Sequence, residues 1–175
     1  MLDLDHPLHK LRSVLSLDHL SSRRDLVSVL ASARGLQRAA ADAGGVLPLL
    51  RGKKLGLLCE DDTSPDAQLF RRSAEELGAH VAHIRPSLSD LTTALEVRHT
   101  ANMLGRLYDA VECQDLSSAL VREVRKEAGI PVYDGVGLRH HATATLAELL
   151  DGSGSAADRR RFVLQAALLQ TIASF

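Results

Sequence analysis

The chain has 175 residues, of which 45% are apolar, and a formal net charge of −1, so it is long enough to form one domain with a substantial core. Its basic residues are scattered, which argues against nucleic acid as a partner, because nucleic-acid binding requires a concentrated basic surface. No stretch is long and apolar enough to span a membrane, and residues 1–5 lack the basic start of a signal peptide. The two cysteines form no disulfide framework, so we expect a cytoplasmic protein.

The amino-terminal part predicts a short arm followed by a long helix. Residues 1–16 are polar and irregular, with a few apolar side chains that are placed to pack as a short helical arm. The sequence Ser22-Arg23-Arg24-Asp25 approximates a capping box. From there, apolar residues recur at helical spacing to about Ala41, which predicts one amphipathic helix.

The stretch at residues 55–84 predicts a strand, a helix and a second strand. Residues 55–59 are a short apolar run, typical of a buried parallel strand. The sequence Ser64-Pro65-Asp66 then begins a helix, because serine is a strong N-cap, proline suits the first helical position and an acid favours the helix dipole. Gly78 ends this helix as a left-handed cap, and residues 79–84 are the next strand.

The remaining elements continue the alternation of helices and strands. We expect helices at 92–108, 116–128, 141–150 and 161–172, and strands at 109–113 and 130–133. Strands separated by helices indicate an α/β fold, a three-layer parallel sheet flanked by helices, with ligands bound beyond the carboxyl ends of the strands. Residues 151–157 are rich in glycine and serine, which is typical of a flexible linker.

Several segments resemble the carbamoyl-phosphate-binding half of aspartate and ornithine carbamoyltransferases. The frame runs from LRGKKLGLLCE to LFRRSAEELGAHVAHI, residues 109–113 resemble Val-Asp-Ala-Ile-Val, and the segment from His141 resembles His-Pro-x-Gln-x-Leu-x-Asp-Leu. The resemblance covers about residues 12–172. It implies that residues 1–150 form a carbamoyl-phosphate-binding-like domain, that residues 151–157 replace a second domain, and that residues 158–175 form a helix that packs back on the first domain.

The phosphate-binding turn of that family reads Ser-Thr-Arg-Thr-Arg, whose hydroxyls, amides and arginines hold the phosphate. The residues at these positions here are Thr63, Ser64, Pro65, Asp66 and Ala67. The resemblance therefore implies that the frame of the turn is kept while both of its arginines are absent. Thr63 and Ser64 still offer hydroxyls to an anion, although a plain N-cap is the more common role of a serine such as Ser64.

Two further motifs of the family are also altered. Its third arginine corresponds to Gln114, and its His-Pro-x-Gln segment keeps His141 but has Ala142 and Ala144 in place of proline and glutamine. Hydrogen bonds to charged groups contribute about 1.5–3 kcal/mol each, so the loss of three arginines is expected to cost roughly 5–9 kcal/mol of binding free energy. That loss corresponds to about three to six orders of magnitude in affinity. His141 retains the ability to polarise a carbonyl, although a histidine at a helix start is the favoured interpretation.

Other residues that are able to carry chemistry favour ordinary structural roles. The histidines, including His80, His83 and His140, have no metal-ligand spacing, so we expect no metal, and no cofactor is expected either. Cys59 and Cys113 end two strands that lie at the same sheet edge; they are either neighbours there or, more commonly, buried inert thiols. The only basic run, Arg159, Arg160 and Arg161, is interpreted as a solvated helix start.

These observations lead to three hypotheses about function. The first is a noncatalytic carbamoyltransferase-like protein that acts as an oligomeric interaction or regulatory subunit; the resemblance implies a homotrimer, or a mixed assembly with a true carbamoyltransferase. The second is a small-molecule sensor for a cationic or neutral ligand, suggested by Asp61, Asp62 and Asp66 around the pocket. The third is residual carbamoyl transfer to ornithine or aspartate, which the altered motifs disfavour. We expect no catalytic residue.

Overall fold

A computed structural model of the chain describes residues 23–152 and 154–173. Its elements are, in chain order, α2 (Arg23–Ala43), β1 (Lys54–Leu58), α3 (Pro65–Glu76), β2 (His80–Ile84), α4 (Ala94–Leu107), β3 (Ala110–Cys113), α5 (Ser118–Ala128), β4 (Val132–Asp134), α6 (Ala142–Glu148) and α7 (Ala156–Ile172). The strands form one parallel sheet in the order β2-β1-β3-β4. The predicted α/β class and parallel sheet are confirmed.

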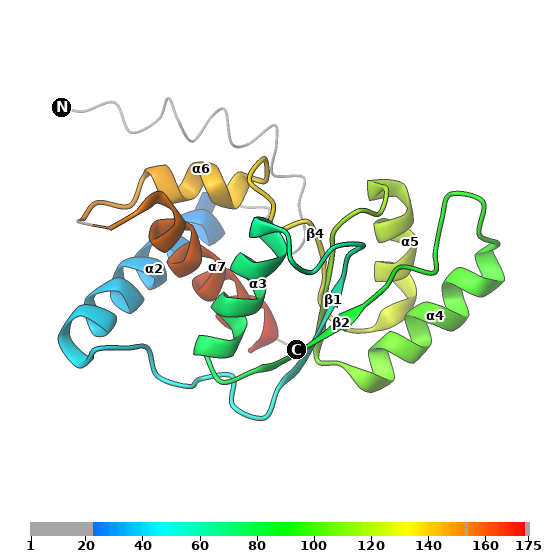
Figure 1. The fold of residues 1–175 in the computed structure, drawn as a ribbon, viewed down its shortest axis with the longest axis horizontal. Helices are drawn as coiled ribbons and strands as arrows, with labels where there is room; N and C mark the ends of the chain where they lie inside the picture. Colours follow the sequence, from blue (N-terminus) through cyan, green and yellow to red (C-terminus); the bar gives the residue numbers. More distant parts are fainter. Residues whose placement is uncertain (1–22, 153, 174–175) are drawn as a thin grey trace.

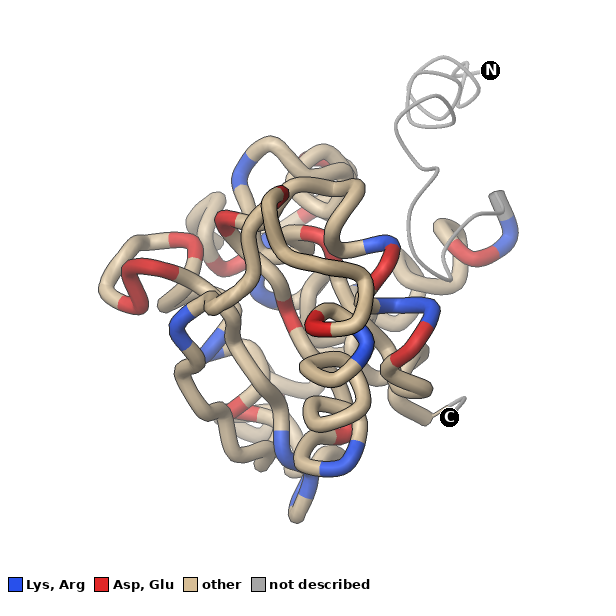
Figure 2. The backbone as a smooth tube through the Cα atoms, turned by 90° about the vertical axis from the view of Figure 1, so that its right-hand side faces the viewer, with Lys and Arg blue, Asp and Glu red and all other residues tan. Residues whose placement is uncertain are grey.

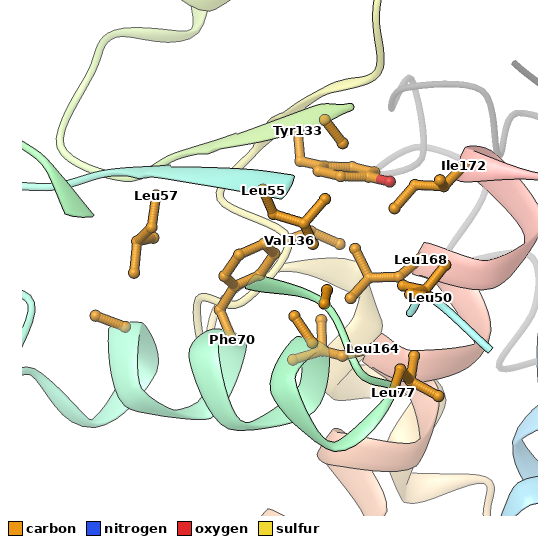
Figure 3. Close-up of a cluster of buried hydrophobic side chains, with 14 of the residues drawn as sticks. Leu50, Leu55, Leu57, Phe70, Leu77, Tyr133, Val136, Leu164, Leu168 and Ile172 are labelled. Atoms are coloured by element: carbon orange, nitrogen blue, oxygen red, sulfur yellow. The ribbon is translucent and has the colours of Figure 1, made fainter. Parts of the chain in front are cut away.

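Helices cover both faces of the sheet, so the predicted three layers are present (Figure 1). Helices α4 and α5 lie on one face and α3 and α7 on the other, with α2 and α6 packed outside α7. The core between the sheet and the α3–α7 layer joins Leu55 and Leu57 of β1 to Phe70 of α3 and to Leu164 and Leu168 of α7 (Figure 3). Helix α7 therefore belongs to the main core of the domain.

Helices α4 and α5 approach each other closely on the opposite face. Gly105 of α4 lies so near to α5 that a Cβ atom there would be 2.0 Å from the carbonyl oxygen of Ala128. The surrounding core is built from apolar side chains of both helices and of β3, among them Leu104, Val111 and Val124. A glycine is required at position 105 because any side chain would force the two helices apart.

A second helical core lies between α2, α6 and α7. Val29 and Ala33 of α2 and Val163 and Ala166 of α7 are completely buried there. The apolar spacing that predicted the first long helix thus marks a face that packs on α7. The expected amino-terminal arm and the Ser22 cap lie outside the described residues.

Helix α7 begins at Ala156, five residues before the predicted start and inside the predicted linker. Ser155 and Asp158 explain the difference, because they form a capping box in which Ser155 Oγ accepts from Asp158 N and the Asp158 carboxylate accepts from Ser155 N. The left-handed conformation expected of Gly78 is confirmed, with φ of 87°, and Gly129, which caps the end of α5, is left-handed as well, with φ of 67°. The helix and strand ends otherwise agree with the predictions to within about two residues.

Candidate functional site

The predicted site lies where three neighbouring strands end. In a parallel sheet the carboxyl ends of all strands lie at one edge. The segments that follow β1 (residues 59–64), β3 (114–117) and β4 (135–141) therefore meet there. These segments and the first turns of α3 and α6 contain the residues of the predicted pocket: Thr63, Ser64, Pro65, Asp66, Ala67, Gln114, His141 and Ala144.

The turn before α3 keeps the frame that the sequence predicted. Ser64 is the N-cap of α3, and its Oγ accepts a hydrogen bond of 3.2 Å from Ala67 N. Pro65 occupies the first turn, and Ala67 is completely buried. Thr63 bonds within the turn, with its N and Oγ1 donating to Asp61 Oδ1 at 2.9 and 2.5 Å. The hydroxyls of Thr63 and Ser64 are therefore engaged by the turn itself.

Asp66 connects the start of α3 to two distant segments of the chain through hydrogen bonds of its carboxylate. Its Oδ1 accepts from Arg160 Nη2 at 3.3 Å, and its Oδ2 accepts from Arg139 N at 3.1 Å. The Arg139 guanidinium lies 3.6 Å from Oδ2, and the Asp66 side chain is only 13% exposed. The carboxylate is thus held by two cationic residues, one from α7 and one from the segment before α6.

Gln114 faces a buried carboxylate that the sequence analysis did not single out. Its Nε2 donates to Glu112 Oε1 at 3.1 Å, and Glu112 is completely buried in β3. The same carboxylate accepts from Val136 N and Gly137 N at 3.1 and 3.0 Å. A carboxylate in the middle of a strand therefore fixes the β4–α6 segment to the sheet. Its signal in the sequence was an acid inside an otherwise apolar strand.

The β4–α6 segment packs directly against the start of α3. A Cβ atom at Gly137 would lie 3.1 Å from Phe70 Cβ, 3.1 Å from Gln114 Nε2 and 3.3 Å from Asp66 O. Gly137 O also accepts from Arg160 Nη2 at 2.8 Å. Asp66 and Gln114 thus both lie next to Gly137. The β4–α6 segment and α3 are so close at this point that no side chain larger than a hydrogen atom fits between them without a shift.

His141 caps α6 and keeps one unused ring nitrogen. Its Nδ1 accepts from Thr143 N at 3.1 Å, which leaves the proton on Nε2. Nε2 is buried and has no hydrogen-bond partner among the described residues. Burial lowers the pKa of His141 to about 4, against an opposing influence of Asp134 and with a further lowering by His140. The ring is therefore neutral at pH 7, and Ala144, whose backbone N donates to His141 O, has no polar side chain.

The three aspartates that suggested a cation-binding pocket have intramolecular partners. Asp61 binds Thr63, which lowers the pKa of the Asp61 carboxyl. Asp62 lies 3.3 Å from Arg71 Nη2 and 3.6 Å from His83 Nδ1. Since Asp66 is engaged as well, this geometry argues against a cationic ligand held by these side chains.

The comparisons with known proteins cover most of the chain. Residues 12–151 match the family model described as "Aspartate/ornithine carbamoyltransferase, carbamoyl-P binding domain". The chain belongs to the aspartate/ornithine carbamoyltransferase family. It is 35% identical over 139 residues to the catabolic ornithine carbamoyltransferase of Burkholderia mallei, which covers 79% of this chain and 41% of that protein. It is 33% identical over 141 residues to the ornithine carbamoyltransferase of Cutibacterium acnes, covering 81% and 42%. The chain thus spans about two fifths of the length of these carbamoyltransferases.

Solved structures of carbamoyltransferases share the fold. The ornithine carbamoyltransferase from Pyrococcus furiosus superposes with a TM-score of 0.60 at 23% identity, over 72% of this chain and 40% of that one. The catalytic subunit of aspartate transcarbamoylase from M. jannaschii superposes with a TM-score of 0.58 at 18% identity, over 87% of this chain and 44% of that one. At these identities the likeness supports the carbamoyltransferase fold alone.

The basic run of this carbamoyltransferase-family chain is not a solvated helix start, as the sequence analysis expected. Arg160 and Arg161 are 21% and 15% exposed, and they pair with Asp66 and Glu76, the two ends of α3. Burial tends to raise the pKa of Glu76, but hydrogen bonds from Arg72 and Arg161 outweigh it and leave the pKa below its usual range. The physical reason is that the start of α7 packs against α3. The arginine side chains of α7 therefore pair with the acidic residues of α3 and are not fully hydrated.

The two cysteines lie on opposite faces of the sheet. Cys59 packs with Leu57 in the α3–α7 core, whereas Cys113 packs with Val111 in the α4–α5 core. Both are free and buried. The possibility that they are neighbours at the sheet edge was wrong, because side chains alternate between the faces of a strand. Among the described residues no group of histidines, cysteines and acids is arranged to hold a metal ion.

Proposed function

We propose that this chain is a noncatalytic member of the carbamoyltransferase family that acts as an oligomeric interaction or regulatory subunit of amino acid metabolism in the cytoplasm. The observation that carries the proposal is the state of the phosphate-binding turn. Pro65, Ala67 and Gln114 occupy the positions where the family resemblance places arginines, and Asp66 beside them is paired internally. A turn without its cations has lost the electrostatic attraction that holds a doubly charged phosphate.

The connection between α6 and α7 belongs to the same proposal. Seven residues, 149–155, join the two helices. Family resemblance places the second, amino-acid-binding domain at this point of the chain order. We propose that the short connection replaces that domain here, with α7 packed on α2, α3 and α6.

A face of α4 supports the role in assembly. Leu91, just before α4, is 95% exposed, and Leu95, Met103 and Leu107 on the helix are 51–53% exposed. We call these four residues the α4 face. A shallow hollow of about 360 Å³ lies at the Met103 and Leu107 end of this face and is also lined by His99, Asn102 and Arg106. Single exposed apolar residues are ordinary, but a group along one helix is typical of a surface covered by a partner. We propose that other copies of this chain cover it, in a homotrimer.

Charged groups are distributed differently from a nucleic-acid-binding surface. Acidic and basic positions are interspersed along the described chain (Figure 2). None of the described helices has both the length and the apolar character that crossing a membrane requires.

Two measurements test the proposal. Isothermal titration with carbamoyl phosphate is expected to show no binding at millimolar concentrations, and incubation at high protein concentration with carbamoyl phosphate and ornithine or aspartate is expected to give no citrulline or carbamoyl-aspartate. A catalytic carbamoyltransferase serves as the positive control in both. Micromolar binding or steady product formation by this chain would contradict the noncatalytic role.

The assembly is tested by light scattering after size exclusion. The wild-type chain is expected at three times its mass of 18.9 kDa, independent of concentration. Leu107→Glu is expected to give monomers, because a carboxylate at a buried contact loses its hydration. Leu47→Glu is the matched control, because Leu47 is 68% exposed in the segment between α2 and β1, away from α4 (Figure 1). A strictly monomeric wild type, or identical behaviour of the two variants, would contradict the proposed interface.

A further inference from the structure

Asp66 has an unusual set of partners for a residue in the first turn of a helix. Its carboxylate accepts from the Arg160 guanidinium and from the Arg139 backbone N–H, while the Arg139 guanidinium lies 3.6 Å away. Arg160 reaches this point across 94 positions of the sequence. An acid at a helix start needs no such partners for its capping role, so the arrangement demands a separate explanation.

The partners of Asp66 are themselves held in place. Arg160 Nη2 also donates to Gly137 O at 2.8 Å, and its side chain is only 21% exposed. The segment that carries Arg139 is fixed to the sheet through the bonds from Val136 N and Gly137 N to Glu112. The fold therefore positions the Arg160 guanidinium and the Arg139 backbone N–H around one small anionic group, with the Arg139 guanidinium, 70% exposed, at its outer side.

We propose that the Asp66 carboxylate is a built-in substitute anion, which occupies the place that a phosphate-class oxyanion would take between Arg139, Arg160 and the first turn of α3. It acts as an autoinhibitory contact that closes the domain to such ligands. The arginines concerned are at other positions than those where the family resemblance places its phosphate ligands. The phosphate-binding region has therefore not only lost the family's arginines but also holds an internal carboxylate between two other arginines.

The packing of Gly137 supports the closure. The absence of a side chain lets the β4–α6 segment approach the first turn of α3, where a Cβ would already lie 3.3 Å from Asp66 O. A free phosphate must therefore take the place of the carboxylate within a closely packed region. Because Asp66 is tethered, its effective concentration at the arginines is in the millimolar range or above, and it outcompetes free anions at ordinary concentrations.

The inference rests on the proposal that the native chain does not bind carbamoyl phosphate, and it is independent of the assembly. The test removes the carboxylate in two ways, Asp66→Asn, which keeps the shape, and Asp66→Thr, which supplies a hydroxyl. Glu76→Gln is the matched control, because it removes the acid that pairs with Arg161 at the other end of the same helix. Inorganic phosphate is the probe, followed by thermal shift and by the amide NMR signals of Ala67, Gly137 and Arg139.

Phosphate at about 10 mM, within the millimolar range of the tethered carboxylate itself, is expected to raise the melting temperature of both Asp66 variants and to move the three amide signals. The wild type and Glu76→Gln are expected to respond at least about tenfold more weakly. Adding Arg160→Gln to Asp66→Asn is expected to abolish the response. Phosphate-dependent recovery of structure would support the inference if the variants are unfolded without it.

Three results would overturn the inference. The first is a folded Asp66→Asn that ignores phosphate, and the second is a pair of variants that stays unfolded even in phosphate. Neither result touches the noncatalytic role. The third is a wild type that binds phosphate at the same amides as tightly as the variants do, which would count against the noncatalytic role as well.

Discussion

The backbone N–H of Gly137 donates a hydrogen bond of 3.0 Å to the carboxylate of Glu112, which lies completely buried in β3. Val136 N and Gln114 Nε2 donate to the same carboxylate. The carboxylate of Glu112 and the amide of Gln114 together fix to the sheet the segment that carries Gly137, Arg139 and His141. An acid inside a buried strand therefore holds one side of the site in place.

Replacing Glu112 is expected to destabilise the chain strongly. Glu112→Ala leaves buried donors without an acceptor, and we expect the free energy of unfolding to fall by about 3–5 kcal/mol. Glu112→Gln keeps one acceptor oxygen and is expected to cost about half as much. Urea unfolding followed by circular dichroism measures both. Glu127→Ala, at an exposed position of α5, is the control and is expected to stay within about 0.5 kcal/mol of the wild type. A cost for Glu112→Ala as small as that of the control would disprove the role of the carboxylate.

Two helical glycines are expected to respond in opposite directions to the same substitution. Gly105→Ala places a Cβ 2.0 Å from the Ala128 carbonyl oxygen, so α4 and α5 must move apart, at a cost of about 1–3 kcal/mol or more. Gly35→Ala in α2 meets nothing within 4 Å and is expected to stabilise the chain by about 0.5–1 kcal/mol, because alanine favours the helix. Thermal and urea unfolding of the two variants test this. Equal effects of the two substitutions would show that the close approach of α4 and α5 is not maintained in solution.

The sequence predicted the elements well because their signals are local. Apolar runs, the Ser64 cap and the Gly78 end depend only on neighbouring residues, and the structure has them where they were expected. The partners of Arg160 were missed because they lie 23 and 94 positions away. No local pattern distinguishes an arginine that points to water from one that reaches α3. Glu112 was overlooked although an acid in a buried strand is itself a local signal.

Both cysteines are expected to be unreactive in the folded chain. Burial raises the pKa of Cys59 to about 11, with further raising by Asp115 and Asp62 and an opposing influence of Arg71. At pH 8 this lowers the fraction of thiolate by about a hundredfold relative to a thiol with the usual value. We expect a thiol-specific reagent to label the native chain at least about a hundred times more slowly than the urea-unfolded chain, in which both cysteines react. A disulfide-linked product in the absence of reductant, or fast labelling of Cys59, would be inconsistent with two thiols buried on opposite faces of the sheet.

His141 is expected to make the stability of the chain depend on pH. Its pKa in the folded chain is about 4 because of burial, whereas an unfolded histidine has a pKa near 6.5. Between these values the unfolded chain binds a proton that the folded chain does not, so stability rises with pH across the window. The contribution is complete above about pH 6.5 and is lost as the pH falls to about 4, and it amounts to about 3 kcal/mol.

The matched variant for this test is His141→Asn, because asparagine accepts the same N-cap hydrogen bond from Thr143 N without titrating. Carboxylates such as Asp158, whose pKa is lowered by its hydrogen bonds to Ser155, titrate in both proteins and cancel in the difference. Urea unfolding at a series of pH values from 4 to 7.5 is expected to show that the wild type loses more stability than the variant as the pH falls. Parallel curves for the two proteins would mean that the His141 ring is accessible to water in solution. Such a result would contradict the burial of His141 Nε2 in the structure.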